Sequence, residues 1–109
     1  YDGTETNLAQ HIVDRVAEEN ARHAGAGNLG VVVGATLTDP PRLDGVGGMV
    51  LMPGVGAQGG TMEDVRRIAG GEETAQLVCP NVSRGVLRAG PHSADLRNAV
   101  AEQTAALRL

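Results

Sequence analysis

Three short apolar runs, separated by helix-like segments, constrain the fold of this chain most strongly. The runs cover residues 29–35, 49–52 and 76–82, and the first is continuous and rich in valine. Such runs are typical of strands buried in a parallel sheet. Strands that alternate with helices pair in parallel through right-handed crossovers. The sequence therefore predicts an α/β fold with the order α-β-α-β-α-β-α.

The expected helices are marked by one apolar face or by capping residues. Leu8, Ile12 and Val16 recur at helical spacing, which predicts a helix from about Thr6 to His23. Glycines 25 and 27 would end it. The other expected helices are a short one begun by Asp39-Pro40-Pro41, one over residues 61–69, and a last one capped by Ser93 with Leu96, Val100 and Leu107 on one side.

Three strands alone make an incomplete sheet. A flat three-stranded parallel sheet has two unpaired edges and one poorly covered face, and apolar edges invite further strands. The chain has 109 residues, and Tyr1 is its only aromatic residue, so packing relies on aliphatic side chains. Because the chain begins at Tyr1 and not at methionine, we also expect sequence upstream of it. More sheet is therefore expected from outside these residues.

Charge and cysteine content argue against several classes of partner. The net charge is −4, all nine basic residues are arginine, and charges of both signs are scattered. This leaves no basic stripe for a nucleic-acid backbone. The single Cys79 cannot form an internal disulfide, and no apolar run approaches the roughly 20 residues that span a bilayer. We expect a cytoplasmic protein that binds neither nucleic acid nor membrane.

The glycine-rich run at residues 53–60 is the strongest functional signal. It has the sequence Pro-Gly-Val-Gly-Ala-Gln-Gly-Gly and directly follows the second apolar run. Glycines allow positive φ and close approach to a ligand, as a phosphate-binding loop requires. The capping pattern Thr61-Met62-Glu63-Asp64 follows, and the N–H groups of the helix it opens would also face an anion. This context favours a phosphate-binding loop over the alternative, a flexible surface turn.

Three segments together resemble the C-terminal part of orotidine 5′-phosphate decarboxylase, in its longer bacterial subgroup. They are residues 30–36 (GVVVGAT), residues 52–60 (MPGVGAQGG) and residues 81–87 (NVSRGVL) with Ala89-Gly90. The resemblance implies a (β/α)8 TIM barrel, a fold of about 250 residues. This chain would supply strands six to eight with their helices, and the N-terminal part of the barrel would be absent. It further implies a homodimer without cofactor or metal.

The resemblance also implies roles for residues of this chain. Gln58 would bridge the 5′-phosphate and the pyrimidine, and Arg84 would grip the phosphate, assisted by backbone N–H groups around Ser83. A guanidinium matches phosphate oxygens in charge and geometry, and barrels often bind phosphate after strands seven and eight. Gly56 and Gly59 would belong to the same grip. The substrate mouth would include Thr36 and Pro53.

No residue of this chain can supply the decarboxylation chemistry that the resemblance implies. The family uses an array of lysine and aspartate from earlier strands, and this chain contains no lysine. We therefore expect the 109 residues to bind phosphate and to be inactive alone. The resemblance implies conversion of orotidine 5′-phosphate to uridine 5′-phosphate by the longer protein. The alternatives are a non-catalytic half-barrel that binds a phosphorylated nucleoside or sugar, and another phosphate-handling barrel.

The remaining polar residues have simpler explanations. His11 and His23 lie twelve residues apart, about three helical turns, so they cannot share a metal ion. Cys79 is expected to pack as a small hydrophobic residue within its strand. Acidic pairs such as Glu18-Glu19 are expected on solvated helix faces. The sequence therefore predicts no metal site.

Overall fold

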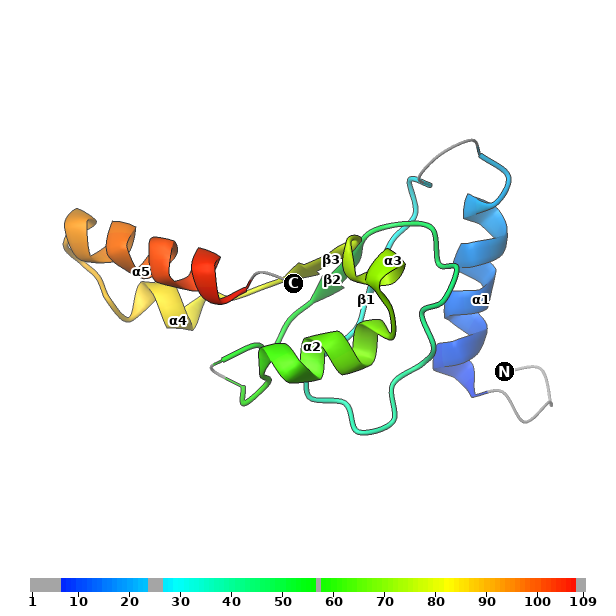
Figure 1. Cartoon of the computed structure of the whole chain (residues 1–109), viewed down its shortest axis with the longest axis horizontal. Helices are drawn as coiled ribbons and strands as arrows, with labels where there is room; N and C mark the ends of the chain where they lie inside the picture. Colours follow the sequence, from blue (N-terminus) through cyan, green and yellow to red (C-terminus); the bar gives the residue numbers. More distant parts are fainter. Residues whose placement is uncertain (1–6, 24–26, 57, 108–109) are drawn as a thin grey trace.

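The computed structural model describes residues 7–23, 27–56 and 58–107 and shows an α/β chain with a parallel sheet (Figure 1). The expected helix start at Thr6 and the expected stop at Gly25 lie outside the described residues. The sheet has three parallel strands, as predicted, and their order is β1-β2-β3. In chain order the elements are α1 (Leu8–Asn20), β1 (Val31–Val32), β2 (Val50–Met52), α2 (Met62–Ala69), α3 (Glu72–Ala75), β3 (Val78–Pro80), α4 (Arg84–Leu87) and α5 (Ser93–Ala106).

Main-chain hydrogen bonds carry the sheet beyond the short formal strands. Val50 pairs with Val31 on one side and with Val78 on the other. The N–H groups of Val33 and Ala35 donate to the carbonyls of Leu51 and Pro53 at 2.9 and 2.8 Å. The run at residues 29–35 therefore pairs with its neighbour well past the end of β1. This extension brings the segments that follow β1 and β2 to the same edge.

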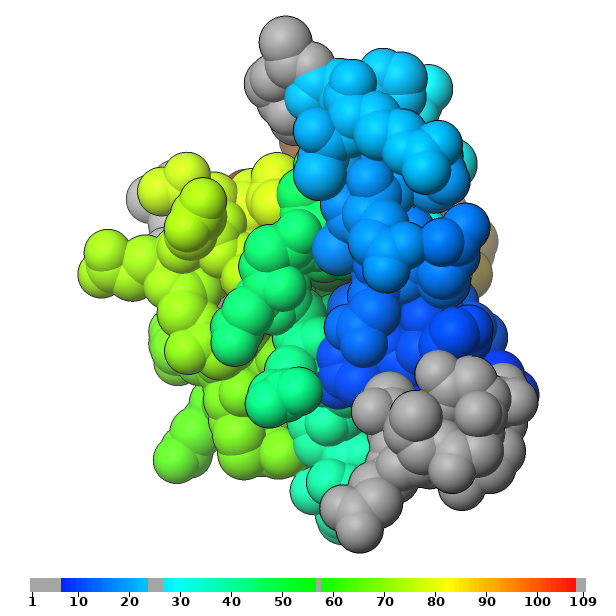
Figure 2. Space-filling view, turned by 90° about the vertical axis from the view of Figure 1, so that its right-hand side faces the viewer, coloured from blue at the N-terminus to red at the C-terminus, as the bar shows by residue number. Residues whose placement is uncertain are grey.

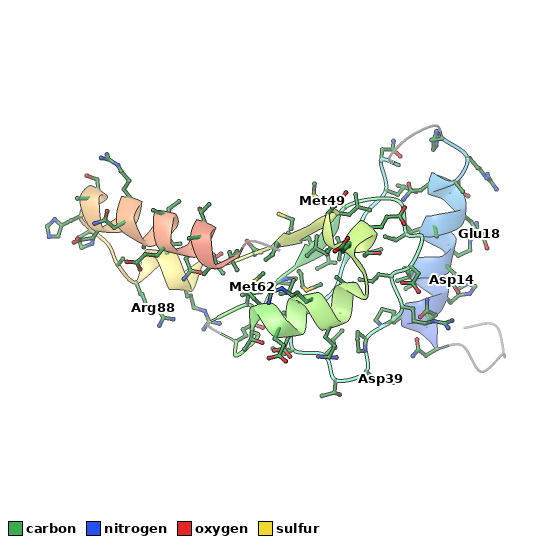
Figure 3. The ribbon with its side chains drawn as sticks, viewed as in Figure 1. Asp14, Glu18, Asp39, Met49, Met62 and Arg88 are labelled. Atoms are coloured by element: carbon green, nitrogen blue, oxygen red, sulfur yellow. The ribbon has the colours of Figure 1, made fainter. Side chains whose placement is uncertain are left out.

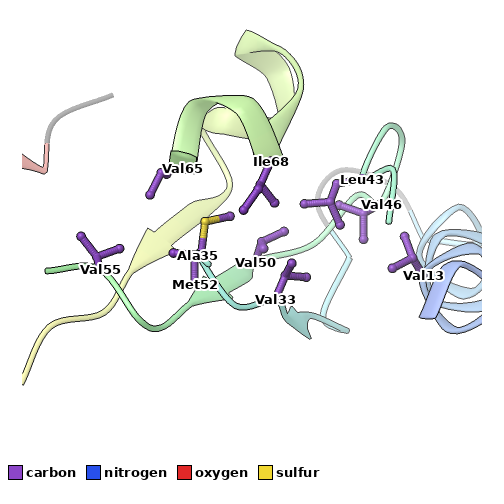
Figure 4. Packing of buried hydrophobic residues seen from close by; sticks show 10 residues of the cluster. All are labelled: Val13, Val33, Ala35, Leu43, Val46, Val50, Met52, Val55, Val65 and Ile68. Atoms are coloured by element: carbon purple, nitrogen blue, oxygen red, sulfur yellow. The ribbon is translucent and has the colours of Figure 1, made fainter. Parts of the chain in front are cut away.

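One face of the sheet is covered, and the core lies there (Figure 4). Val65 and Ile68 of α2 pack over Val50 and Met52, and all four side chains are at most 3% exposed. The helix that supplies this cover begins at a capping box, as its sequence predicted. The Thr61 hydroxyl accepts from the Asp64 N–H at 3.1 Å, and the Asp64 carboxylate accepts from the Thr61 N–H at 2.9 Å.

The opposite face of the sheet is open. Val32, Leu51 and Cys79 lie side by side in the strand register, and Val32 is 68% exposed. Cys79 is also exposed, so the expectation that it is packed is wrong for this structure. Likewise, residues 29–35 are not covered on both sides, because no described segment packs on this second face. The expected incompleteness of a three-stranded sheet is confirmed.

No helix connects β1 to β2, so the short helix expected at Asp39-Pro40-Pro41 is wrong. Gly45 and Gly47 follow closely, and both have a φ of +71°, which no right-handed helix accommodates. The connection instead places Leu43 and Val46, each 1% exposed, into the core. Figure 2 shows this teal-to-green connection beside α1. An irregular loop thus covers the area where a crossover helix was expected.

The other helices differ from expectation at their ends and in number. Asn7 caps α1, and Ser93 is the first residue of α5, one position after the cap at His92. The short helices α3 and α4 were not expected from the sequence. The α4 helix packs against α5, and together they extend away from the sheet (Figure 1). Val100 of α5 is 50% exposed, so the expected apolar face of this helix is only partly covered.

A buried asparagine joins α1 to the start of the sheet. Asn20 is 3% exposed, and its Nδ2 donates to the carbonyls of Leu29 and Val46 at 2.9 and 2.8 Å. Its Oδ1 accepts from the Leu29 N–H at 3.2 Å. Buried polar groups are costly unless they are paired, and this side chain satisfies three of them at once. We call this set of bonds the Asn20 clamp.

The capping box of α2 predicts a pH-dependent contribution to stability. The Thr61 N–H, together with the Thr61 hydroxyl and the Arg67 side chain, lowers the pKa of Asp64 below its usual 3.8. A carboxylate with a lowered folded-state pKa stabilises the fold above its unfolded pKa, and the stabilisation is lost as pH falls through the folded pKa. We expect Asp64→Asn to lower the free energy of unfolding at neutral pH, and the difference from wild type to shrink in acid. Urea denaturation over a pH series measures this difference in the free energy of unfolding. A difference that stays constant into strong acid would contradict the prediction.

Candidate functional site

The segments that follow β2 and β3 enclose a small polar cavity of about 80 Å3. Carboxyl ends of parallel strands share one edge of a sheet, which is why these two segments meet. The segment after β2 contributes Pro53, Gly54, Val55 and Gln58. The segment after β3 contributes Asn81, Val82, Ser83 and Arg84. Gln58 and Arg84, expected from the sequence to act together, therefore line the same cavity.

The glycine-rich loop has the backbone conformation that its sequence predicted. Gly54, Gly56 and Gly59 have φ values of +95°, +78° and +95°, in the region that favours glycine. The loop closes on itself, because the N–H of Gly56 donates to the Gly60 carbonyl and that of Gly59 donates to the Gly56 carbonyl, each at 2.8 Å. The N–H of Gly60 donates to the Gly54 carbonyl at 3.0 Å. These amides are therefore engaged inside the loop.

The fold of this loop positions Gln58 over Gly54. A Cβ atom added to Gly54 would lie 3.3 Å from the Gln58 Oε1 atom. The lack of a side chain at Gly54 thus makes room for the Gln58 carboxamide beside the cavity. Gly56 and Gly59 do not line the cavity, and they shape the turn that carries Gln58.

The start of α2 does not face the cavity with free N–H groups. The Asp64 carboxylate occupies this helix end through the capping box, and its negative charge would repel an anion. None of residues 61–64 lines the cavity. The cavity lies against the β3–α4 segment instead, and the expected contribution of this helix end to anion binding stays a prediction.

Arg84 is the cation of the cavity. Its carbonyl accepts a hydrogen bond from the Arg88 Nε at 3.2 Å, which directs the Arg88 side chain back onto α4 (Figure 3). The ion pairs of Arg15, Arg22 and Arg67 do not include Arg84, and no ion pair of Arg84 is formed among the described residues. No carboxylate lines the cavity either. The Arg84 guanidinium is therefore available to an anionic ligand.

The other predicted site residues occupy different positions. Ser83 lines the cavity, and its side chain makes no capping hydrogen bond to α4. Pro53 lines the cavity as well, and its carbonyl accepts the hydrogen bond from Ala35. Thr36 is exposed in the turn after the first strand segment and does not line the cavity. The structure thus brings Gln58, Ser83, Arg84 and Pro53 together, with Thr36 outside the group.

Sequence reasoning did not single out Asn81 and the apolar walls Val55 and Val82. Asn81 had a recognisable signal, because it is the polar residue directly after a strand, where ligand-contacting side chains collect in α/β folds. Val55 is 8% exposed and lies opposite Gly60 in an isolated β-bridge. Val55 lines the cavity on the loop side, a position that depends on how the loop folds and that the sequence alone does not indicate.

The acidic residues of α1 form a charged outer face. Arg15 pairs with Glu18 at 2.6 Å and with Glu19 at 3.6 Å, and Figure 3 shows Asp14 and Glu18 projecting away from the sheet. This confirms the solvated face predicted for the Glu18-Glu19 pair. Among the described residues, no group of three or more histidine, cysteine, aspartate or glutamate side chains could hold a metal ion. No helix in the described part of the chain has the length and apolarity to cross a membrane.

Comparison with known proteins gives consistent matches. The family model described as Orotidine 5′-phosphate decarboxylase / HUMPS family matches residues 2–99. A protein named orotidine 5′-phosphate decarboxylase from Corynebacterium efficiens is 54% identical over 107 residues, covering 95% of this chain and 38% of that protein. One of the same name from Corynebacterium glutamicum is 53% identical, covering 91% of this chain and 36% of that protein. The chain thus spans less than two fifths of the length of these relatives.

A solved structure also matches the fold. It is a crystal structure of a Streptomyces avermitilis protein provisionally named orotidine 5′-phosphate decarboxylase. The TM-score is 0.79 and the identity 40%, with 94% of this chain and 35% of that chain covered. The likeness therefore extends to the arrangement of the elements as well as to the sequence.

Proposed function

Because the chain belongs to the orotidine 5′-phosphate decarboxylase / HUMPS family, we propose that it forms the phosphate-binding part of an orotidine 5′-phosphate decarboxylase. The reaction is the conversion of orotidine 5′-phosphate to uridine 5′-phosphate and carbon dioxide, a carboxy-lyase step of pyrimidine biosynthesis. The single observation that carries the proposal is the shared cavity of Gln58 and Arg84. It joins a guanidinium that has no ion pair within the described part of the chain to a carboxamide presented by a glycine-rich turn.

The geometry suits a phosphate ester at one end and a polar ring nearby. Arg84 supplies the positive charge, and guanidinium groups bind phosphate oxygens through paired hydrogen bonds. Gln58 carries both a donor and an acceptor, so it can contact a phosphate oxygen and a pyrimidine edge. Ser83 adds a hydroxyl on the Arg84 side, while Gly56 and Gly59 hold the turn. Pro53 would contribute to the mouth from the end of β2, whereas Thr36 lies outside the lining of the cavity.

For the fold, we propose that these residues are the C-terminal part of a (β/α)8 barrel, strands six to eight. The open sheet face and the two free sheet edges support this. So does an apolar groove of about 390 Å3 between α1 and β1, to which Ile12 and Val32 contribute. A second apolar groove, of about 450 Å3, lies between α4 and α5. Neighbouring strands and helices of a complete barrel would cover all of these surfaces.

The division of labour follows from the residues present. The chain contains no lysine, so we assign the lysine and aspartate array to a preceding portion of the protein and no catalytic residue to this one. Binding a remote phosphate can position the reacting end of a substrate and so raise the rate of the chemical step. A homodimer in the cytoplasm, without cofactor, is part of the same proposal.

An activity measurement tests the proposal directly. The protein as its gene encodes it should convert orotidine 5′-phosphate to uridine 5′-phosphate, followed by the change in ultraviolet absorbance of the pyrimidine. The 109 residues alone should show no turnover, because they lack the ammonium group that donates the proton. An encoded protein that binds uridine 5′-phosphate without turnover would favour the non-catalytic binding module. Turnover by the 109 residues alone would overturn the division of labour.

A further inference from the structure

Asn81 occupies a fixed position at the mouth of the cavity. It directly follows β3, and its backbone N–H donates to the Met52 carbonyl at 3.0 Å. The main chain at Asn81 is therefore held against the end of β2, and the residue, which is exposed, lines the cavity with Gln58 and Arg84. Among the described residues, no hydrogen bond to the Asn81 carboxamide is formed. This polar group is thus placed at the cavity without an internal partner.

Three glycine amides of the loop are not free to bind an anion. The N–H groups of Gly56, Gly59 and Gly60 are engaged within the loop. Side-chain donors can therefore add to the backbone N–H groups of the residues that line the cavity. Arg84 and Ser83 lie on the β3–α4 side and Gln58 on the loop side, and Asn81, at the end of β3, carries a planar NH2 group. A neutral donor beside a guanidinium adds a hydrogen bond to an anion without adding charge.

We propose that the Asn81 carboxamide donates a hydrogen bond from Nδ2 to a phosphate oxygen of the ligand held by Arg84. This inference rests on the proposed function for the identity of the ligand, but not for the phosphate contact itself. Asn81 then helps to select the phosphorylated nucleoside over the free nucleoside. A ligand without phosphate gains nothing from this contact.

Three variants of the encoded protein test the contact by titration calorimetry with uridine 5′-phosphate and with uridine. Asn81→Ala should weaken uridine 5′-phosphate binding about tenfold, the loss expected for one hydrogen bond to a charged group. Asn81→Asp should weaken it further, because a carboxylate repels the phosphate. Uridine affinity should be the same in both variants as in wild type. The matched control is Asn98→Ala, an exposed asparagine on α5, which should change neither affinity.

A second measurement uses the wild-type protein and inorganic phosphate, so it requires neither a folded variant nor a nucleoside. Inorganic phosphate added to 15N-labelled wild-type protein should shift the side-chain NH2 resonances of Asn81, and those of Asn98 should not move. If phosphate shifts the Asn81 resonances but uridine 5′-phosphate does not bind, the result would support the contact and contradict the decarboxylase assignment. Normal nucleotide binding by both Asn81 variants would overturn the contact and leave that assignment intact. A fall in uridine affinity equal to that for the nucleotide would also overturn it.

Discussion

Replacing Arg84 with alanine should weaken binding of uridine 5′-phosphate by about 1.5–3 kcal/mol or more, the worth of hydrogen bonds to a charged group. Among the described residues, Arg84 is the only cation that lines the cavity, so no other positive charge there could take over its role. The loss should be larger than for any neutral side chain of the cavity. Titration calorimetry of the encoded protein measures it.

Two further variants sharpen this result. Arg84→Lys keeps the charge but loses the planar fork that matches two phosphate oxygens, so it should restore only part of the affinity. Arg97→Ala removes an exposed arginine on α5, away from the cavity, and should leave affinity unchanged. An Arg84→Ala protein that binds uridine 5′-phosphate as tightly as wild type would remove Arg84 from the site.

Replacing Gly48 with alanine should destabilise the fold by about 3 kcal/mol or more, at the upper end for overpacking of a buried position. A Cβ atom at Gly48 would lie 1.8 Å from the Leu29 carbonyl oxygen and 2.8 Å from the Asn20 Nδ2. The first neighbour is backbone and cannot rotate away. The second belongs to the Asn20 clamp, so relief of the overlap would break buried hydrogen bonds between α1 and the sheet.

The matched control is Gly34→Ala. A Cβ atom there would meet only the Leu37 Cγ, at an ordinary 4.0 Å, so the change should be close to neutral. The free energy of unfolding of both variants is obtained from urea denaturation of the encoded protein. Equal stability of the Gly48 and Gly34 variants would show that residues 27–30 and 47–49 can separate without cost, against the packing described above.

The helices and strands with strong local signals were predictable from the sequence. The 61–69 helix was marked by its capping box, and the run at 49–52 by its continuous apolar residues, and both are confirmed within a residue. The connection between β1 and β2 was not predictable in the same way. Asp39-Pro40-Pro41 is a helix start by local rules, but Gly45 and Gly47 adopt positive φ and the core takes up Leu43 and Val46 instead.

The candidate site, too, was predictable from the sequence only in part. The glycine-rich loop and the 83–84 pair were recognisable as a two-part phosphate signal. Their meeting in one cavity depends on parallel pairing of β2 with β3, which places both carboxyl ends at one edge. The engagement of the N–H groups of Gly56, Gly59 and Gly60 inside the loop could be seen only in three dimensions.

Local chemistry in the sequence was sufficient for the fold class, the parallel strands and the residue types that favour a phosphate, because each depends on periodicity or on one side chain. Tertiary structure alone decided which apolar faces are covered, how the glycine-rich loop uses its own amides, and that the start of α2 lies outside the lining of the cavity. These outcomes depend on contacts between segments distant in the chain, where several pairings compete and only the folded geometry selects one.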